Sequence, residues 1–220
     1  RGAAEKIPGA GRLDRLGASL HGSLAFTGKG HATDRAVILG FCGLKPDTLN
    51  PDEAEALEAE VRQTGLVAPE GLGTLRFNPA EDLVFDYDTV LAGHANGMIL
   101  TAYDQAGHPY HRQTYYSVGG GFVLTEAELE AQRSAPQDMA AQKAERDFPY
   151  PFGSAKEMLA MGQASGRSIA RMKRANETVL HGAALNEKLD HILATMDDCI
   201  DRGLAQGGIL PGGLKVKRRA

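Results

Sequence analysis

The sequence has few cysteines, no long apolar run and little net charge, and each of these absences excludes a class of protein. It has only two cysteines among 220 residues, which excludes a disulfide framework and suits a reducing cytoplasm. No apolar run approaches the roughly 20 residues that a membrane-spanning helix needs, and the opening RGAAE carries no signal-peptide core. The net charge is only −4, with one basic cluster at residues 215–219, so neither nucleic acid nor a membrane is an expected partner.

What is present is the composition of a globular protein. Hydrophobic residues make up 42% of the chain, enough for the core of one large domain or two small ones. Residues 16–26 alternate between apolar and polar side chains, which predicts a half-buried strand. A glycine-containing turn follows, and then an apolar run, 36–41, which we interpret as a buried helix with Thr33 or Asp34 as its N-cap.

Further elements are predicted from caps and turns. Asn50 precedes a proline and two acidic residues, so it should cap a helix that ends at Gly65. Short strands are expected over 72–123, with a hairpin at the turn 104–107. Thr125 and Glu128 form the capping box of a polar helix.

These elements define the expected organisation. Residues 1–130 form an α+β domain, 131–150 a polar linker, and 151–220 helices. Leu185, Leu189, Ile192, Met196 and their neighbours repeat at helical spacing over 184–206. Cys199 lies on that stripe, so we expect it to be a packed thiol. We expect the same of Cys42, because it follows the apolar run 36–41.

The loop Thr27–His31, TGKGH, lies between the predicted strand and helix. It is not a phosphate-binding P-loop, because Gly22 lies one residue too far upstream and Gly30 stands where Ser or Thr is required. A metal at His21, His31 and Asp34 is disfavoured, since no third ligand has a recognised spacing. The loop is either an anion-binding turn at a helix N-terminus or a plain change of direction.

A second glycine cluster lies in SVGGGF, residues 117–122. Three glycines within a predicted strand indicate either a nest of N–H groups for a carboxylate, or a bulge or a close crossing of strands. Alternation sends the preceding Tyr115 and Tyr116 to opposite faces, so one of them should be in the core. The Asn96-Gly97 pair predicts a turn that carries His94.

Five stretches together resemble the bacterial iron–sulfur L-serine dehydratases (L-serine ammonia-lyases). They are GSLAFTGKGHATD, HANGM, QTYYSVGGGF, DFPYPF and GILPGGLKVKRRA, which occur in that family's order over nearly the whole chain. The resemblance implies a β domain over 1–130, similar to the allosteric substrate-binding domain of phosphoglycerate dehydrogenases. It also implies that 151–220 begin an all-α catalytic domain.

The same resemblance implies a chemistry and a set of partners. L-Serine would lose its α-proton and its hydroxyl and yield pyruvate and ammonia, with a [4Fe–4S] cluster acting as Lewis acid and with neither PLP nor a nucleotide. The protein would be a cytoplasmic homodimer, with the rest of the α domain as a further partner. His31 would be the catalytic base or acid. The substrate-binding residues would be Gly28, Lys29, Gly30, His94, Asn96, Ser117, Gly119, Gly120 and Gly121.

The sequence departs from that family in what it lacks. A Ser-rich, His-containing motif expected ahead of Arg1 is absent, as are the cysteines expected beyond Ala220. Cys42 and Cys199 are too few to replace them, so no metal site is expected in this chain. The alternative is a regulatory amino-acid-binding module without catalysis, but the helical part and LPGGLKVKRRA favour the enzyme.

We therefore expect the 220-residue chain alone to be inactive as a lyase. Anaerobic reconstitution with iron and sulfide, followed by a pyruvate assay, tests this expectation. Turnover of L-serine by the isolated chain would show that the missing cysteines are not needed.

Overall fold

A computed structural model describes residues 11–134, 144, 146–210 and 215–218. The chain divides into two compact units. The sheet unit comprises residues 1–134 with 210–215, and the helical unit comprises 135–209 with 216–220. A sheet followed by helices agrees with the predicted α+β class. Among the described helices, none combines the length and the apolar character needed to cross a membrane.

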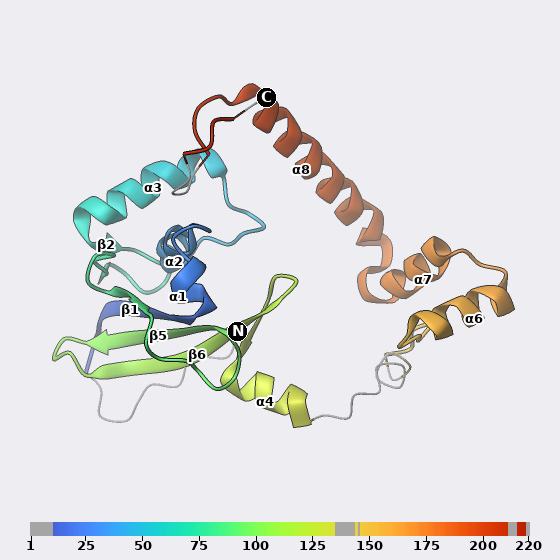
Figure 1. The fold of residues 1–220 in the computed structure, drawn as a ribbon, viewed down its shortest axis with the longest axis horizontal. Coiled ribbons are helices and arrows are strands. Elements are labelled where there is room, and N and C mark those ends of the chain that lie inside the picture. Colours follow the sequence, from blue (N-terminus) through green and yellow to red (C-terminus); the bar gives the residue numbers. More distant parts are fainter. Residues whose placement is uncertain (1–10, 135–143, 145, 211–214, 219–220) are drawn as a thin grey trace. The chain divides into compact units, whose positions relative to one another are not determined.

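The described strands of the sheet unit form one seven-stranded sheet (Figure 1). Its order is β2-β3-β1-β5-β6-β7, and β4 pairs with β1 outside that path. β1 is therefore central: it runs antiparallel to β5 and parallel to β3 and β4. The strands are β1 (Leu13–Gly22), β2 (Leu66–Val67), β3 (Leu75–Arg76), β4 (Leu83–Asp86), β5 (Asn96–Asp104), β6 (Pro109–Gly119) and β7 (Phe122–Thr125).

The helices described beside this sheet are α1 (Ser23–Thr27), α2 (Thr33–Phe41), α3 (Pro51–Thr64) and α4 (Glu126–Ser134). α2 and α3 cover one face of the sheet, as Figure 1 shows, and their apolar sides close the core. Removing such side chains from water is the main stabilising term of this packing. Core residues include Leu20, Val37, Ile38, Val61 and Phe77.

Local sequence signals set several of these boundaries as predicted. The Asn50 side chain accepts a hydrogen bond from the Asp52 N–H at 3.1 Å, and Gly65 ends α3 at a φ of 66°. The hairpin at 104–107 is also confirmed, because the Asp104 N–H donates to the His108 carbonyl at 2.9 Å. The Glu128 carboxylate accepts from the Thr125 N–H at 2.8 Å, which confirms the capping box of α4. α4 extends to Ser134, into the segment predicted as linker.

Two predictions around β1 are wrong. The strand expected over 16–26 stops at Gly22, where φ is 57°, and Ser23–Thr27 form α1 instead. A tertiary contact decides this, since the Ser23 N–H donates to the Ala95 carbonyl at 2.7 Å. α2 is not capped by Thr33 or Asp34. Its N-cap is Ala32 in the left-handed region, and it makes no side-chain capping bond.

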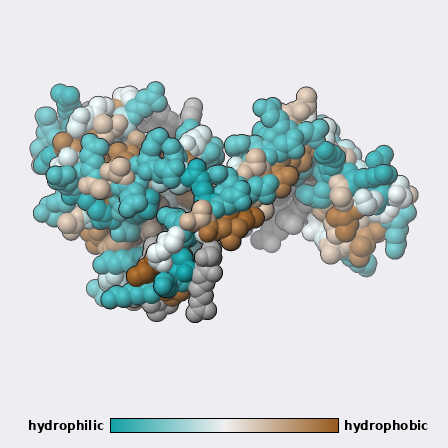
Figure 2. All heavy atoms as spheres, turned by 90° about the horizontal axis from the view of Figure 1, so that it is seen from above, coloured by the Kyte–Doolittle hydropathy of each residue, from teal (hydrophilic) through white to brown (hydrophobic). Residues whose placement is uncertain are grey.

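The helical unit contains α6 (Ala155–Ser165), α7 (Ile169–His181), a short 3₁₀ turn (Gly182–Ala184) and α8 (Leu185–Ala205). The helical periodicity over 184–206 is confirmed by α8, but the expectation of a packed Cys199 is wrong: Cys199 is exposed, and so is most of the apolar stripe. Cys42, in the sheet unit, is only half-buried. Hydrophobic surface of this kind appears as brown spheres in Figure 2. The exposed stripe comprises Leu189, Ile192, Leu193, Met196, Ile200 and Leu204.

Gly22 and Gly40 offer a matched pair of substitutions. In Gly22→Ala the new Cβ would overlap the Ala95 carbonyl oxygen at a positive φ. The strained φ alone costs about 1–3 kcal/mol. In Gly40→Ala, inside α2, the Cβ meets nothing within 4 Å, so the free energy of unfolding should rise by about 0.4–1 kcal/mol. Urea unfolding followed by circular dichroism measures both, and equal effects would contradict the assigned turn at Gly22.

Candidate functional site

Most of the predicted site residues belong to one end of the sheet. Gly22, the last residue of β1, pairs with Asn96, the first residue of β5. β6 ends at Gly119 beside the start of β7, at the same end because β5 and β6 are antiparallel. α1 follows Gly22, packs against β1, β4 and β5, and leads into the TGKGH loop. The topology thus brings together three segments: 27–31, 93–97 and 117–121.

Phe85 of β4 supports the TGKGH loop. A Cβ on buried Gly28 would lie 3.0 Å from Phe85 Cε1 and would overlap the Leu24 carbonyl oxygen, so this position requires glycine. The Lys29 ammonium lies 5.3 Å from the centroid of the same ring, a cation–π distance. The His31 N–H donates to the Thr27 carbonyl at 3.1 Å, while its side chain is exposed and has no hydrogen bond or ion pair within the described residues.

The loop before β5 is held by hydrogen bonds on both sides. The Asn96 N–H donates to His94 Nδ1 at 3.1 Å, and Asn96 Nδ2 donates to the Ser117 carbonyl at 3.3 Å. The Gly93 N–H donates to the Tyr116 hydroxyl at 3.2 Å, and Tyr116 is 1% exposed, which confirms that one of the paired tyrosines is in the core. The predicted turn at Asn96-Gly97 is wrong, because both residues open β5, but His94 does lie in the preceding loop.

The three glycines after Ser117 form a chain reversal rather than the interior of a strand. β6 and β7 pair up to Gly119 and Phe122, so Gly120 and Gly121 are the two central residues of a tight hairpin. Their φ values are 62° and 81°, and positive φ at both central residues is typical of such a turn. A register shift between Ser117 and Gly119 confirms the bulge among the predicted alternatives. A Cβ at Gly119 or Gly121 would meet nothing within 4 Å, so the backbone here is open to a ligand.

His21 lies at the same end of the sheet, but it is only 4% exposed. Its Nε2 is 2.8 Å from Ser19 Oγ, and its Nδ1 is 3.5 Å from Asp86 Oδ2. Asp34 instead pairs with Arg62 at 2.9 Å. Within the part of the chain that the structure describes, no three His, Cys, Asp or Glu side chains could hold a metal ion.

The two thiols do not fit an iron–sulfur cluster. Burial, and to a smaller extent the charge of Glu60, raise the pKa of Cys42, which opposes the thiolate that binds iron. Cys199 lies on α8 and is exposed. Two cysteines are also fewer than the three that the resemblance implies, so these thiols do not fit as the ligands of such a cluster.

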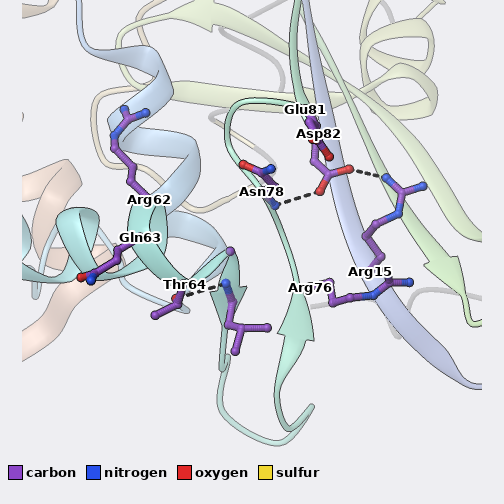
Figure 3. Close-up of a pocket in the computed structure, with 10 residues that line it drawn as sticks. Arg15, Arg62, Gln63, Thr64, Arg76, Asn78, Glu81 and Asp82 are labelled. Atoms are coloured by element: carbon purple, nitrogen blue, oxygen red, sulfur yellow. Dashed lines mark hydrogen bonds and ion pairs between the residues drawn. The ribbon is translucent and has the colours of Figure 1, made fainter.

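A polar pocket of about 510 Å³ lies at the opposite end of β1 (Figure 3). At about 3.3 Å per residue, Arg15 is roughly 23 Å along the strand from Gly22. Every guanidinium in its lining is already paired: Arg15 with Asp82, Arg76 with Asp14, and Arg62 with both Asp34 and Glu58. The pocket contains none of the predicted site residues. Its lining is Arg15, Arg62, Gln63, Thr64, Gly65, Leu66, Arg76, Asn78, Glu81 and Asp82.

Known proteins resemble this chain over most of its length. A family model described as serine dehydratase beta chain matches residues 4–128. The L-serine dehydratase of Streptomyces coelicolor is 38% identical over 202 residues, which cover 91% of this chain and 43% of the relative. L-serine dehydratase 1 of Escherichia coli is 36% identical over 210 residues, covering 94% and 44%. The chain therefore spans less than half the length of these curated relatives.

The hydroxyl of Tyr116 offers a test of the loop geometry. Tyr116→Phe removes the acceptor of the Gly93 N–H and should lower the free energy of unfolding by about 0.5–1.5 kcal/mol. Exchange of the Gly93 amide hydrogen should accelerate at the same time. Tyr115→Phe is the control, and equal exchange rates in the two variants would contradict the role given to the Tyr116 hydroxyl.

Proposed function

Because this chain belongs to the serine dehydratase beta chain family, we propose that it forms part of an L-serine dehydratase, which converts L-serine into pyruvate and ammonia. The observation that carries the proposal is the similarity to proteins of that name over 91–94% of this chain. The reaction removes a proton from Cα and the hydroxyl from Cβ. The resulting aminoacrylate tautomerises and is hydrolysed.

His31 is the proposed group that takes the α-proton. Imidazole changes its protonation near neutral pH, which suits a general base. The geometry supports the role because the side chain is exposed at the end of the sheet where the other two predicted segments lie. Gly30 leaves the approach to His31 uncrowded, because a Cβ there would meet only the Thr27 carbonyl oxygen, at 3.4 Å.

The substrate carboxylate is assigned to the glycine hairpin. Gly119, Gly120 and Gly121 are exposed, and a glycine has no side chain of its own that could cover its N–H group. Asn96, bonded to the Ser117 carbonyl, fixes the strand that leads into this hairpin. Lys29 adds a positive charge in the neighbouring loop.

The remaining parts of the proposal lie outside this chain. A [4Fe–4S] cluster would take its cysteine ligands from other segments of the full-length protein. Those segments would also supply the second wall of the site, and the apolar rim formed by Phe26, 69% exposed, and Tyr87, 49% exposed, is suited to such a contact. We extend the proposal to a β domain of the allosteric substrate-binding type, a homodimer and a cytoplasmic location.

Substitution of His31 in the full-length protein tests the assignment. His31→Ala should lower kcat for L-serine by about 10²-fold or more, because it removes the general base. The absorption spectrum of the bound cluster should stay unchanged. His108→Ala is the control, since His108 has a 75% exposed side chain in the hairpin at the far end of β5. Near-normal turnover by His31→Ala would make His31 a turn residue only.

A further inference from the structure

The TGKGH loop packs on the end of β4. β4 has only four residues and, within the described sheet, pairs only with β1. Phe85 contacts the loop through Gly28 and Lys29, and the ring of Tyr87 packs on Phe26 of α1 with centroids 5.2 Å apart. Any shift of this short strand would therefore be passed to the loop that carries His31.

Asp86 lies between these two aromatic residues, and alternation turns its side chain to the other face of the sheet. Its two oxygens have different neighbours. Oδ1 accepts from the N–H groups of Asp88, at 3.0 Å, and Thr89, at 2.9 Å. Oδ2 lies 3.5 Å from His21 Nδ1. Hydrogen bonds from Thr89 above all, then from Asp88, with a smaller effect of His21, lower the pKa of Asp86, so this carboxylate is charged at neutral pH.

His21 is the counterpart of Asp86 on β1, and the two residues are in register in the parallel pairing of β1 with β4. Its Nδ1 is buried and has no hydrogen-bond partner among the described residues. Buried polar groups without partners are rare in folded proteins. The carboxylate at 3.5 Å needs only a small movement to satisfy this nitrogen, while Ser19 Oγ already satisfies Nε2.

We propose that His21 is a positioning residue for the TGKGH loop. By facing Asp86 through Nδ1, it holds the end of β4 against β1 and so fixes the position of Gly28, Lys29 and His31. Its consequence for turnover rests on the function proposed above. The placement of the loop itself does not depend on that function.

Two amide substitutions separate the two ring nitrogens. In His21→Asn the side-chain amide lies where Nδ1 was, so it can still face Asp86 but does not reach Ser19. In His21→Gln the amide reaches the place of Nε2, so the Ser19 contact is kept and the Asp86 contact is lost. Asp86→Asn removes the charge of the carboxylate that Nδ1 faces. Ser19→Ala is the matched control for the Nε2 contact.

Hydrogen exchange of the full-length protein, followed by mass spectrometry, is the first measurement. We expect His21→Gln and Asp86→Asn to accelerate exchange over 27–31 and 86–89 by about tenfold, because the contact between His21 Nδ1 and the Asp86 carboxylate is lost. His21→Asn and Ser19→Ala should exchange like the unmodified protein. Equal rates in the Asn and Gln variants, or acceleration confined to β1, would overturn the proposal.

Steady-state kinetics with L-serine is the second measurement. His21→Gln should lower kcat by about tenfold with a smaller change in KM, because His31 is displaced while the glycine hairpin is not. The kcat of His21→Asn should equal that of the unmodified protein. If the unmodified protein does not turn over L-serine but the exchange rates still separate Gln from Asn, the proposed function fails and the positioning role stands. If turnover is normal in every variant, the positioning role fails and the proposed function stands.

Discussion

The pairing of Gly22 with Asn96 is the contact on which this end of the molecule depends. It joins the last residue of β1 to the first residue of β5. At the same point the positive φ of Gly22 ends the strand, and the Ser23 N–H donates to the Ala95 carbonyl. The chain is thereby turned into α1 and delivered to the TGKGH loop. A residue with a Cβ would overlap the Ala95 carbonyl oxygen at Gly22, so the backbone itself requires glycine here.

The site built on this contact combines a fixed frame with open functional groups. Hydrogen bonds or packing hold Tyr116, Asn96 and Phe85 in place, and these residues in turn support the loops of the site. His31 and the Gly119–Gly121 hairpin are exposed. An arrangement of this kind suits a site that a second surface completes. It differs from the polar pocket at the other end of β1, where each guanidinium is already paired with a carboxylate.

The elements that sequence predicted well are those determined by neighbouring residues. The helix from Asn50 to Gly65 and the capping box at Thr125 each need only a few adjacent side chains. Elements decided by distant contacts were missed. The end of β1 depends on Ala95, and alternation alone could not reveal it. The pairing of His21 with Asp86 joins residues 65 positions apart, although the alternation of EDLVFDYD does place Asp86 opposite its two aromatic neighbours. Periodicity gave α8, but it could not show that its apolar stripe is exposed in this chain.

A crystal structure of the full-length protein with L-serine bound would show directly which end of the sheet holds the substrate. We expect the substrate at the end of the sheet formed by Gly22, Asn96 and Ser117. Its carboxylate should lie against the Gly119–Gly121 hairpin, with Cα facing His31. L-Serine bound only at the opposite end of β1, between Arg62 and Arg76, would contradict this assignment of the site.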